Sequence, residues 1–242
     1  MKIILKEWSI YSLGDHAIVF ALDAKMDLNI LQKITQLHQY ILAKKINGTL
    51  DIIPSYHTLT LVYDIPQFLS FNEDANNQLV NFSTQLLHDF NAQTSSNKNI
   101  NKTLHKVPVC YENDFALDIE NISILNQISI EAIIQIHSST LYDVYSIGFL
   151  PGFTYMGIID EKIKIARHDK PRTRVPAGSV GIAGLQTGIY PTNSPGGWQI
   201  IGKTPLKIFD PNPTILAKFN VGDQVQFYPI TKNEFETLNE YN

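Results

Sequence analysis

The segment Val180–Phe209 reads VGIAGLQTGIYPTNSPGGWQIIGKTPLKIF and sets short apolar runs between glycines and prolines. Runs of this kind are typical of strands, because glycine and proline interrupt them too early for a helix. The segment contains the apolar runs Val180–Ala183, Trp198–Ile201 and Leu206–Phe209. A fourth run, Tyr142–Phe149, precedes it, and a fifth, Gln224–Tyr228, follows it. Short strands at this spacing predict a barrel or a closed sandwich.

The first ninety residues have a different pattern, in which strands and helices are mixed. Residues 3–10 and 16–22 predict two strands joined by a turn at Gly14-Asp15, and residues 58–63 predict a third. Asp27 is placed to cap a helix that closes at Asn47-Gly48. The apolar positions of this helix and of a second one are Ile30, Ile34, Leu37 and Ile41, then Leu79, Phe82, Leu86 and Phe90. The pattern predicts an α+β unit with helices on one face of a small sheet.

The stretch between the two patterns, residues 91–103, reads NAQTSSNKNINKT and has almost no apolar content. Such a composition is typical of a linker. We therefore expect a small α/β domain over residues 1–90, a linker over 91–106 and a mainly-β domain over 107–242. Two short helices are expected early in the second domain, at 118–126 and at 129–137 with Ser129 as the N-cap.

Composition excludes several classes of protein. The chain has 242 residues, a net charge of −4 and no basic stripe, which argues against a nucleic-acid-binding surface. The single cysteine, Cys110, rules out an internal disulfide and lies in a strand-like run, where a buried structural thiol is expected. The N-terminal run carries charges too early for a signal peptide, and no apolar stretch is long enough for a bilayer. We expect a cytoplasmic protein.

All three arginines fall within residues 166–176, which read ARHDKPRTRVP. In the rest of the chain, lysine is the residue that supplies positive charge. Arg172 and Arg174 alternate around Thr173, so an extended backbone points both side chains to one side. A forked pair of guanidinium groups suits a carboxylate or a phosphate. The alternative, that both are surface cations paired with acids such as Asp169, stays open.

An aromatic loop precedes the arginines: residues 148–157 read GFLPGFTYMG. Its glycines allow close approach of the backbone, and Phe149, Phe153 and Tyr155 are able to wall a pocket for a small or flat ligand. The alternative is a barrel corner in which these rings only fill the core.

Residues 197–204, GWQIIGKT, match the phosphate-loop pattern letter by letter. A phosphate loop needs a flexible interior and a helix directly after it. Here the interior is strand-like and Pro205 precedes an alternating run, so we interpret the segment as a strand. The seven histidines show no metal-binding spacing, and His137 ends a predicted helix, where a cation complements the helix dipole.

Four blocks resemble the KipI family, also called allophanate hydrolase subunit 1, whose bacterial members include the B component of 5-oxoprolinase. The blocks are Ser146–Gly157, Pro171–Val180, Ile182–Pro191 and Ser194–Pro205, the last followed by Phe209–Pro211. Weaker matches at Tyr11–Asp15, Val107–Tyr111 and His137-Ser138 extend the resemblance over essentially the whole chain. The chain departs from the family at Thr154, where a proline is usual, and at Lys203, where an arginine is common.

The resemblance implies a cyclophilin-like barrel from about residue 107 behind the small α/β domain. It implies one component of an ATP-dependent 5-oxoprolinase, a cyclic amide hydrolase that opens 5-oxoproline to L-glutamate. The chain alone is then expected to be inactive. ATP, with magnesium, is expected to belong to a complex with a KipA-type C component and an A component. Two alternatives stay open: a KipI-type regulator that inhibits a sensor histidine kinase, and a component of urea or allophanate metabolism.

The candidate catalytic residues are Arg172 and Arg174. We expect them to face an aromatic cleft that is bounded by Phe149, Phe153, Tyr155 and Trp198 and shared with the KipA-type partner. No metal ligands are expected. The candidate substrate-binding residues are Phe149, Pro151, Gly152, Phe153, Tyr155, Gly178, Ser179, Gln186, Tyr190, Gly197 and Trp198.

Overall fold

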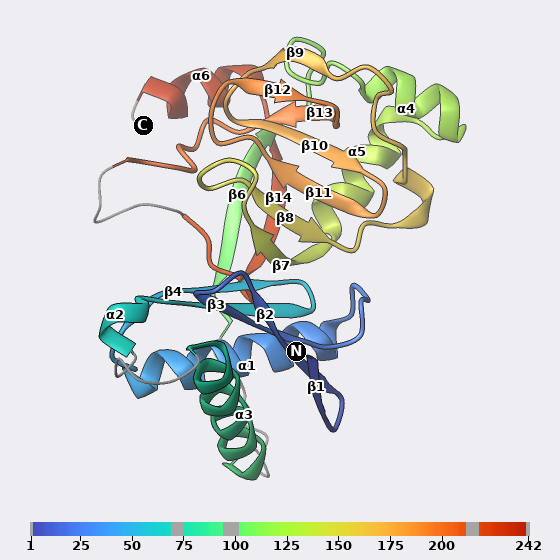
Figure 1. Ribbon diagram of the computed structural model, residues 1–242. Helices are drawn as coiled ribbons and strands as arrows, with labels where there is room; N and C mark the ends of the chain where they lie inside the picture. Colours follow the sequence, from blue (N-terminus) through green and yellow to red (C-terminus); the bar gives the residue numbers. More distant parts are fainter. Residues whose placement is uncertain (1, 69–74, 94–101, 212–217, 241–242) are drawn as a thin grey trace. The chain divides into compact units, whose positions relative to one another are not determined.

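A computed structural model of the chain describes residues 2–68, 75–93, 102–211 and 218–240. The chain divides into two compact units, Met1–Asn101 and Lys102–Asn242 (Figure 1). Each unit has its own hydrophobic core, so each is described by itself.

The first unit contains an antiparallel sheet in the order β1-β2-β3-β5-β4. Its strands are β1 (Lys2–Leu5), β2 (Trp8–Leu13), β3 (Ala17–Ala21), β4 (Thr49–Ser55) and β5 (Thr58–Tyr63). The predicted turn joins β2 to β3, with Gly14 at φ +69°. The single strand predicted over residues 3–10 is wrong: Lys6, at φ 56°, turns the backbone there and separates β1 from β2.

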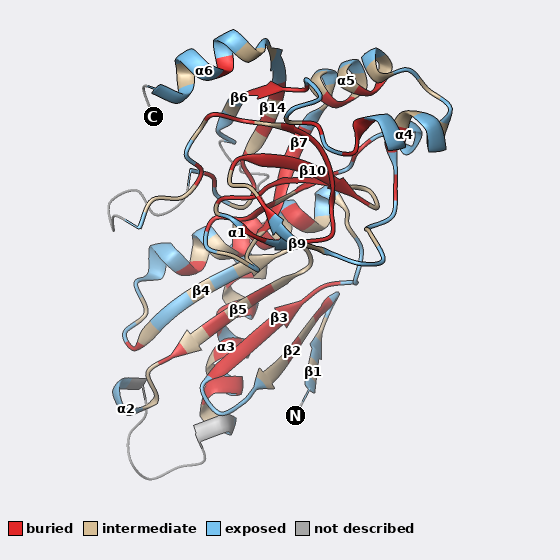
Figure 2. Cartoon of the chain, turned by 90° about the horizontal axis from the view of Figure 1, so that it is seen from above, coloured by how far each residue is buried: buried red, intermediate tan, exposed pale blue. Residues whose placement is uncertain are grey.

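The helices α1 (Leu28–Lys44) and α3 (Ala75–Gln93) pack on one face of this sheet. The single turn α2 (Ile65–Phe68) follows β5. The Asp27 cap is confirmed, since its carboxylate accepts hydrogen bonds from the amides of Asn29 and Ile30. Leu37 and Leu87 are fully buried against the sheet. Figure 2 shows β3 buried along its length and β4 largely open to solvent.

The second unit contains a closed, mixed seven-stranded barrel, which confirms the mainly-β prediction. Its strands are β6 (Leu104–Cys110), β7 (Leu141–Ile147), β8 (Thr154–Gly157), β10 (Ser179–Ala183), β11 (Gln186–Ile189), β13 (Gln199–Lys203) and β14 (Gln224–Ile230). The order is β7-β14-β6-β13-β10-β11-β8, and pairing of β8 with β7 closes the barrel. Only β14 and β6 run parallel. A separate ribbon pairs β9 (Arg172–Val175) with β12 (Ser194–Gly196).

Two of the strand predictions in this unit had different outcomes. The phosphate-loop-like segment lies in β13, as expected, and no helix follows it over residues 204–211. The strand predicted over Leu206–Phe209 is wrong. The amide of Leu206 donates to the Thr204 hydroxyl, which turns the chain out of the sheet beside Pro205.

Four short helices accompany the barrel: α4 (Ile119–Asn126), α5 (Ile130–Ser139), the 3₁₀ turn η1 (Glu161–Ile163) and α6 (Lys232–Glu240). The Ser129 cap is confirmed by its hydroxyl, which accepts a hydrogen bond from the amide of Ala132. Helix α5 packs against β14 (Figure 1). Within the described ranges, every helix is too short or too polar to span a bilayer.

The boundary between the units, at Asn101 and Lys102, lies inside the predicted linker over 91–106, but a helix and a strand extend into the two ends of that range. Helix α3 continues to Gln93 and β6 begins at Leu104, while residues 94–101 lie outside the described ranges. The start of β6 resembles a linker because its first three residues stay partly exposed. Backbone pairing with β14, from Leu104 opposite Gln224, nevertheless makes them part of the barrel.

The barrel interior holds one buried polar chain centred on His137. Its Nδ1 lies 2.7 Å from the Tyr111 hydroxyl and its Nε2 lies 2.9 Å from Thr187 Oγ1. Burial lowers the pKa of His137 to about 3, so the ring is neutral. The predicted role as a cation at the end of a helix is therefore wrong. The ring is a core residue that stacks on Phe227, with centroids 4.5 Å apart. Cys110 is buried as expected, and burial raises the pKa of its thiol.

Candidate functional site

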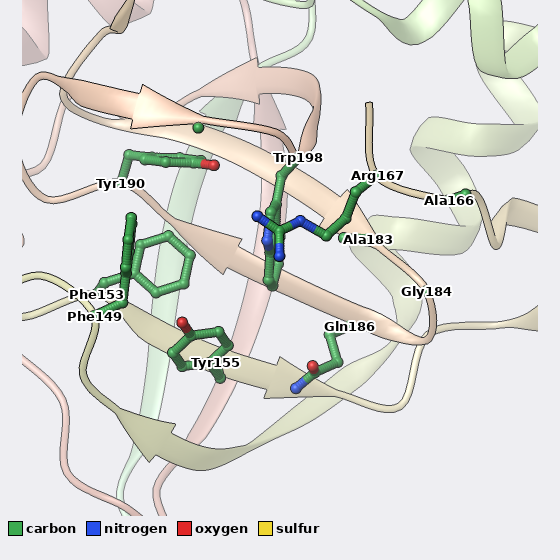
Figure 3. A pocket seen from close by; sticks show the side chains of 11 residues that line it. Phe149, Phe153, Tyr155, Ala166, Arg167, Ala183, Gly184, Gln186, Tyr190 and Trp198 are labelled. Atoms are coloured by element: carbon green, nitrogen blue, oxygen red, sulfur yellow. The ribbon is translucent and has the colours of Figure 1, made fainter. Parts of the chain in front are cut away.

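A cavity of about 500 Å³ opens on the outer face of the barrel wall (Figure 3). Alternation along β8 separates the two faces: Met156 joins the barrel core, whereas Tyr155 packs with the outer cluster of Phe153, Tyr190 and Trp198. The cavity is lined by Phe149, Phe153, Tyr155, Ala166, Arg167, Ala183, Gly184, Gln186, Tyr190, Gly196 and Trp198. A concave, mostly apolar site with a few polar groups is the usual form of a small-molecule site.

Glycines make room for the rings on this face. A Cβ at Gly188 would lie 2.8 Å from the carbonyl oxygen of Thr154 and 3.1 Å from the Trp198 ring. A Cβ at Gly196 would lie 2.3 Å from the Tyr190 hydroxyl. Real Cβ atoms essentially never approach within 3.0 Å, so glycine at these two positions is needed for the rings and strands to pack this closely.

Phe153 stands at the centre of the aromatic cluster. Its ring meets the rings of Tyr155, Tyr190 and Trp198 edge to face, with centroids 4.7, 5.1 and 5.4 Å apart. Phe149 meets it in the same way at 5.8 Å and is itself 69% exposed at the mouth of the cavity. Edge-to-face packing holds each ring in one orientation. The cavity wall is therefore preformed.

Two phenols bring hydroxyl groups to the cavity. Burial raises the pKa of Tyr155 and of Tyr190, and the charge of Arg167 acts in the opposite direction on both. Both phenols are consequently protonated at neutral pH and able to donate hydrogen bonds. Figure 3 shows these two side chains, the Gln186 amide and the Arg167 guanidinium group around one space.

Arg172 lies outside the cavity lining and is bound to Asp118. Its guanidinium group donates two hydrogen bonds to that carboxylate, at 2.9 and 2.6 Å. The same carboxylate accepts the amide of Ile200 at 2.6 Å and is only 4% exposed. His168 Nε2 lies 2.8 Å from Arg172 Nη1 and 3.3 Å from Asp118 Oδ1. We call Asp118, His168 and Arg172 the carboxylate clamp.

The structure thus corrects the expectation that Arg172 and Arg174 face the aromatic cleft. Arg172 is turned to Asp118 because a buried carboxylate must be paired, and Arg174 is exposed on β9. The open alternative of arginine–acid pairing describes Arg172, although Asp118 takes the place suggested for Asp169. A part for either arginine in catalysis stays a prediction.

Six of the predicted substrate-binding residues do line the cavity: Phe149, Phe153, Tyr155, Gln186, Tyr190 and Trp198. The other five are absent from its lining and support the loops around it. Gly152 and Gly178 adopt φ of +81° and +80°, and Pro151 is exposed beside the former. Ser179 is buried, with its backbone bonded to Pro176 and Tyr190. A Cβ at Gly197 would lie 3.6 Å from Arg167 Nε, in ordinary van der Waals contact, so Gly197 lies beside that side chain.

Arg167, the one charged residue among those that the structure places around the cavity, was not predicted from the sequence. Its membership of the arginine cluster was visible, but the alternation around Thr173 favoured the other two. Ala166, Ala183, Gly184 and Gly196 also line the cavity and carry no chemical signal in the sequence. Among the described residues, no group of three or more histidine, cysteine or acidic side chains is arranged to hold a metal ion.

The chain is similar to known proteins over most of its length. The family model described as carboxyltransferase domain, subdomain C and D, matches residues 8–217. The B component of the 5-oxoprolinase of Bacillus subtilis is 34% identical over 96% of this chain and 97% of its own length. A solved structure of a conserved uncharacterized protein from Pyrococcus horikoshii is 36% identical, covers 93% of this chain and 99% of its own, and has a TM-score of 0.54. The urea amidolyase of Lachancea kluyveri is 23% identical over 89% of this chain, which spans 13% of that protein.

Proposed function

This chain belongs to the carboxyltransferase-domain family, subdomains C and D, and we propose that it is the B component of an ATP-dependent 5-oxoprolinase. The complex opens the lactam ring of 5-oxoproline to give L-glutamate. The observation that carries the proposal is the match to the B. subtilis protein, which runs over nearly the full length of both chains. We further propose that the barrel is of the cyclophilin-like type and that the complex is cytoplasmic.

Opening a lactam is demanding because the amide carbonyl is a poor electrophile. Hydrolysis of ATP supplies the driving force when the nucleotide and its magnesium are bound by the complex. This chain's own part is to bind and orient the lactam. The segment that resembles a phosphate loop is a barrel strand, which supports a nucleotide site on the partner rather than on this chain alone.

The aromatic cavity is where we place the lactam. Flat apolar walls from Phe153, Tyr155 and Trp198 suit the faces of a five-membered ring. The phenol hydroxyls are placed to meet polar atoms at the ring's edge. The cavity is open to one side, which leaves room for a KipA-type C component to complete the site, and the A component is expected in the same assembly.

The test is reconstitution. The chain is co-expressed with its KipA-type partner and the A component, and glutamate release from 5-oxoproline is measured with and without ATP. We expect release only from the assembled complex and only with ATP. Activity of the chain alone, or tight ATP binding that is lost on Lys203→Ala, would contradict the proposed division of labour.

A second function has one specific observation in its favour, the weaker match to urea amidolyase. Assembly with a biotin-dependent carboxylase and turnover of urea or allophanate would support it. Binding to a sensor histidine kinase, with inhibition of its autophosphorylation and no lactam turnover, would instead favour the regulatory alternative.

A further inference from the structure

Arg167 brings the single charge to a cavity that is otherwise aromatic and neutral among its described lining residues. The whole chain has a net charge of −4 and contains only three arginines. The charge of Arg167 is therefore not part of a generally basic surface. No described residue forms a hydrogen bond or an ion pair with Arg167, whereas Arg172, five positions on, is neutralised by Asp118. The two arginines therefore have different electrostatic roles.

The Arg167 side chain extends over Gly197 and in front of Trp198, with its guanidinium group toward the centre of the cavity (Figure 3). A guanidinium group in such a position offers paired N–H donors to one planar anion, and carboxylates match that fork. Arg167 itself is exposed at the cavity, so solvent screens part of this interaction and the aromatic walls must supply the rest of the affinity.

The backbone that carries Arg167 is fixed on both sides. The Gln199 side-chain amide donates to the carbonyl oxygen of Ala166 at 3.1 Å, and the amide of His168 donates to the carbonyl oxygen of Gly197 at 2.8 Å. Beyond them the carboxylate clamp holds the segment at Arg172. The backbone at Arg167 is thus held in place before any ligand arrives, which reduces the entropy lost on binding.

We propose that Arg167 binds the carboxylate of a small cyclic amide whose ring lies against the aromatic walls of the cavity. Arg167 is then the residue that distinguishes an anionic lactam from a neutral one. The choice of a lactam rests on the proposed function, whereas recognition of a carboxylate rests on the cavity alone. The two parts are therefore separable by experiment.

The chain offers a direct probe, because its two tryptophans, Trp8 and Trp198, lie in different units. Full-length protein labelled with 5-fluorotryptophan gives one ¹⁹F resonance for each, assigned with Trp198→Phe. Titration uses three ligands: 5-oxoproline, 2-pyrrolidone, which has the same ring without the carboxylate, and cyclopentanecarboxylate, which has a carboxylate without the lactam. The Trp8 resonance is the internal control.

We expect saturable movement of the Trp198 resonance with 5-oxoproline and none of Trp8. Arg167→Gln should weaken this binding by about 10- to 100-fold and Arg167→Lys by less, because lysine keeps the charge but loses the fork. The matched control, Lys170→Gln, removes an exposed cation from the same segment and should bind as wild type. The preference for 5-oxoproline over 2-pyrrolidone should disappear in Arg167→Gln.

The outcomes separate the two proposals. Binding of cyclopentanecarboxylate through Arg167 without binding of 5-oxoproline supports the anion site and contradicts the proposed substrate. Wild-type affinity for 5-oxoproline in Arg167→Gln, or no response of Trp198 to either carboxylate, overturns the assignment of Arg167.

Discussion

The two faces of the barrel wall are packed differently although the same strands form both. On the inner face, β10 and β11 contribute Val180, Ile182 and Ile189 to a closed apolar core. On the outer face, the alternate positions include Gly181 and Gly188, and aromatic rings lie where side chains would otherwise stand. The inner face is closely packed by side chains, whereas the outer face leaves a cavity.

Polar groups follow the same division. Inside, His137 is bonded through both ring nitrogens and fully buried, so it serves the fold and is closed to solvent. Outside, Arg167 stands at an open cavity with no ion-pair partner among the described residues. A satisfied, buried polar group stabilises a structure, and an unpaired cation in a preformed cavity is available to a ligand.

The largest expected effect is on the inner face and depends on pH. The pKa of His137 is about 3 in the folded chain against 6.5 for the free side chain. The unfolded state therefore binds a proton first, and stability is complete above pH 6.5 and falls between pH 6.5 and 3 by about 4 to 5 kcal/mol. Urea unfolding at pH 7.0 and 4.5 measures this loss, which should be about 2 to 3 kcal/mol greater in wild type than in His137→Gln. Equal losses in the two proteins would show that the buried ring is not the cause.

The next effect concerns the carboxylate clamp, which joins the outer face to α4. Asp118→Asn removes the charge that pairs Arg172, and we expect a loss of about 3 kcal/mol in unfolding free energy, near the lower end for buried pairs since Arg172 is partly exposed. Asp169→Asn, an exposed acid on the same segment, should change stability by less than about 0.5 kcal/mol. Similar values for the two variants would mean that the clamp does not hold the segment.

A smaller change in stability should accompany a large change in binding at Gly196. The added methyl group of Gly196→Ala meets the Tyr190 ring, so we expect about 1 to 3 kcal/mol of destabilisation. Displacement of that ring should also weaken 5-oxoproline binding by about tenfold or more. Gly148→Ala adds a methyl group with no atom within 4 Å and is the matched control. Unchanged 5-oxoproline binding in Gly196→Ala would show that the ligand does not contact the Tyr190 side of the cavity.

Local signals predicted most of the fold. Asp27 and Ser129 cap helices through contacts two or three residues away, and the Gly–Pro spacing of the second unit is itself the pattern of a barrel. The same kind of signal failed at Leu206–Phe209, where the alternating pattern predicted a strand. There the hydrogen bond from the Leu206 amide to the Thr204 side chain turns the backbone out of the sheet. The local signal also failed at the start of β6, whose partner β14 lies more than a hundred residues away along the chain.

The candidate site was predicted in part, for the same physical reason. The aromatic walls come from residues that the loop sequence places together, so Phe149, Phe153 and Tyr155 were identified. The partner of Arg172 is 54 positions away in the sequence, and no local pattern marks Asp118 as buried. Without that partner, Arg172 and Arg174 looked equivalent and Arg167 looked incidental. Pairing across the fold, rather than spacing, decides which arginine faces the cavity.

The central claim, that the outer face binds the substrate through Arg167, is tested most directly by kcat/KM for 5-oxoproline in the assembled complex. Arg167→Lys, Arg174→Lys and Lys170→Gln are each co-purified with the partner proteins and compared with wild type. We predict that Arg167→Lys assembles normally and loses about tenfold in kcat/KM, less than Arg167→Gln, while Lys170→Gln stays within about threefold. The account would be contradicted if Arg167→Lys kept full activity while Arg174→Lys showed the loss in kcat/KM predicted for Arg167→Lys. The substrate-binding arginine would then lie on β9.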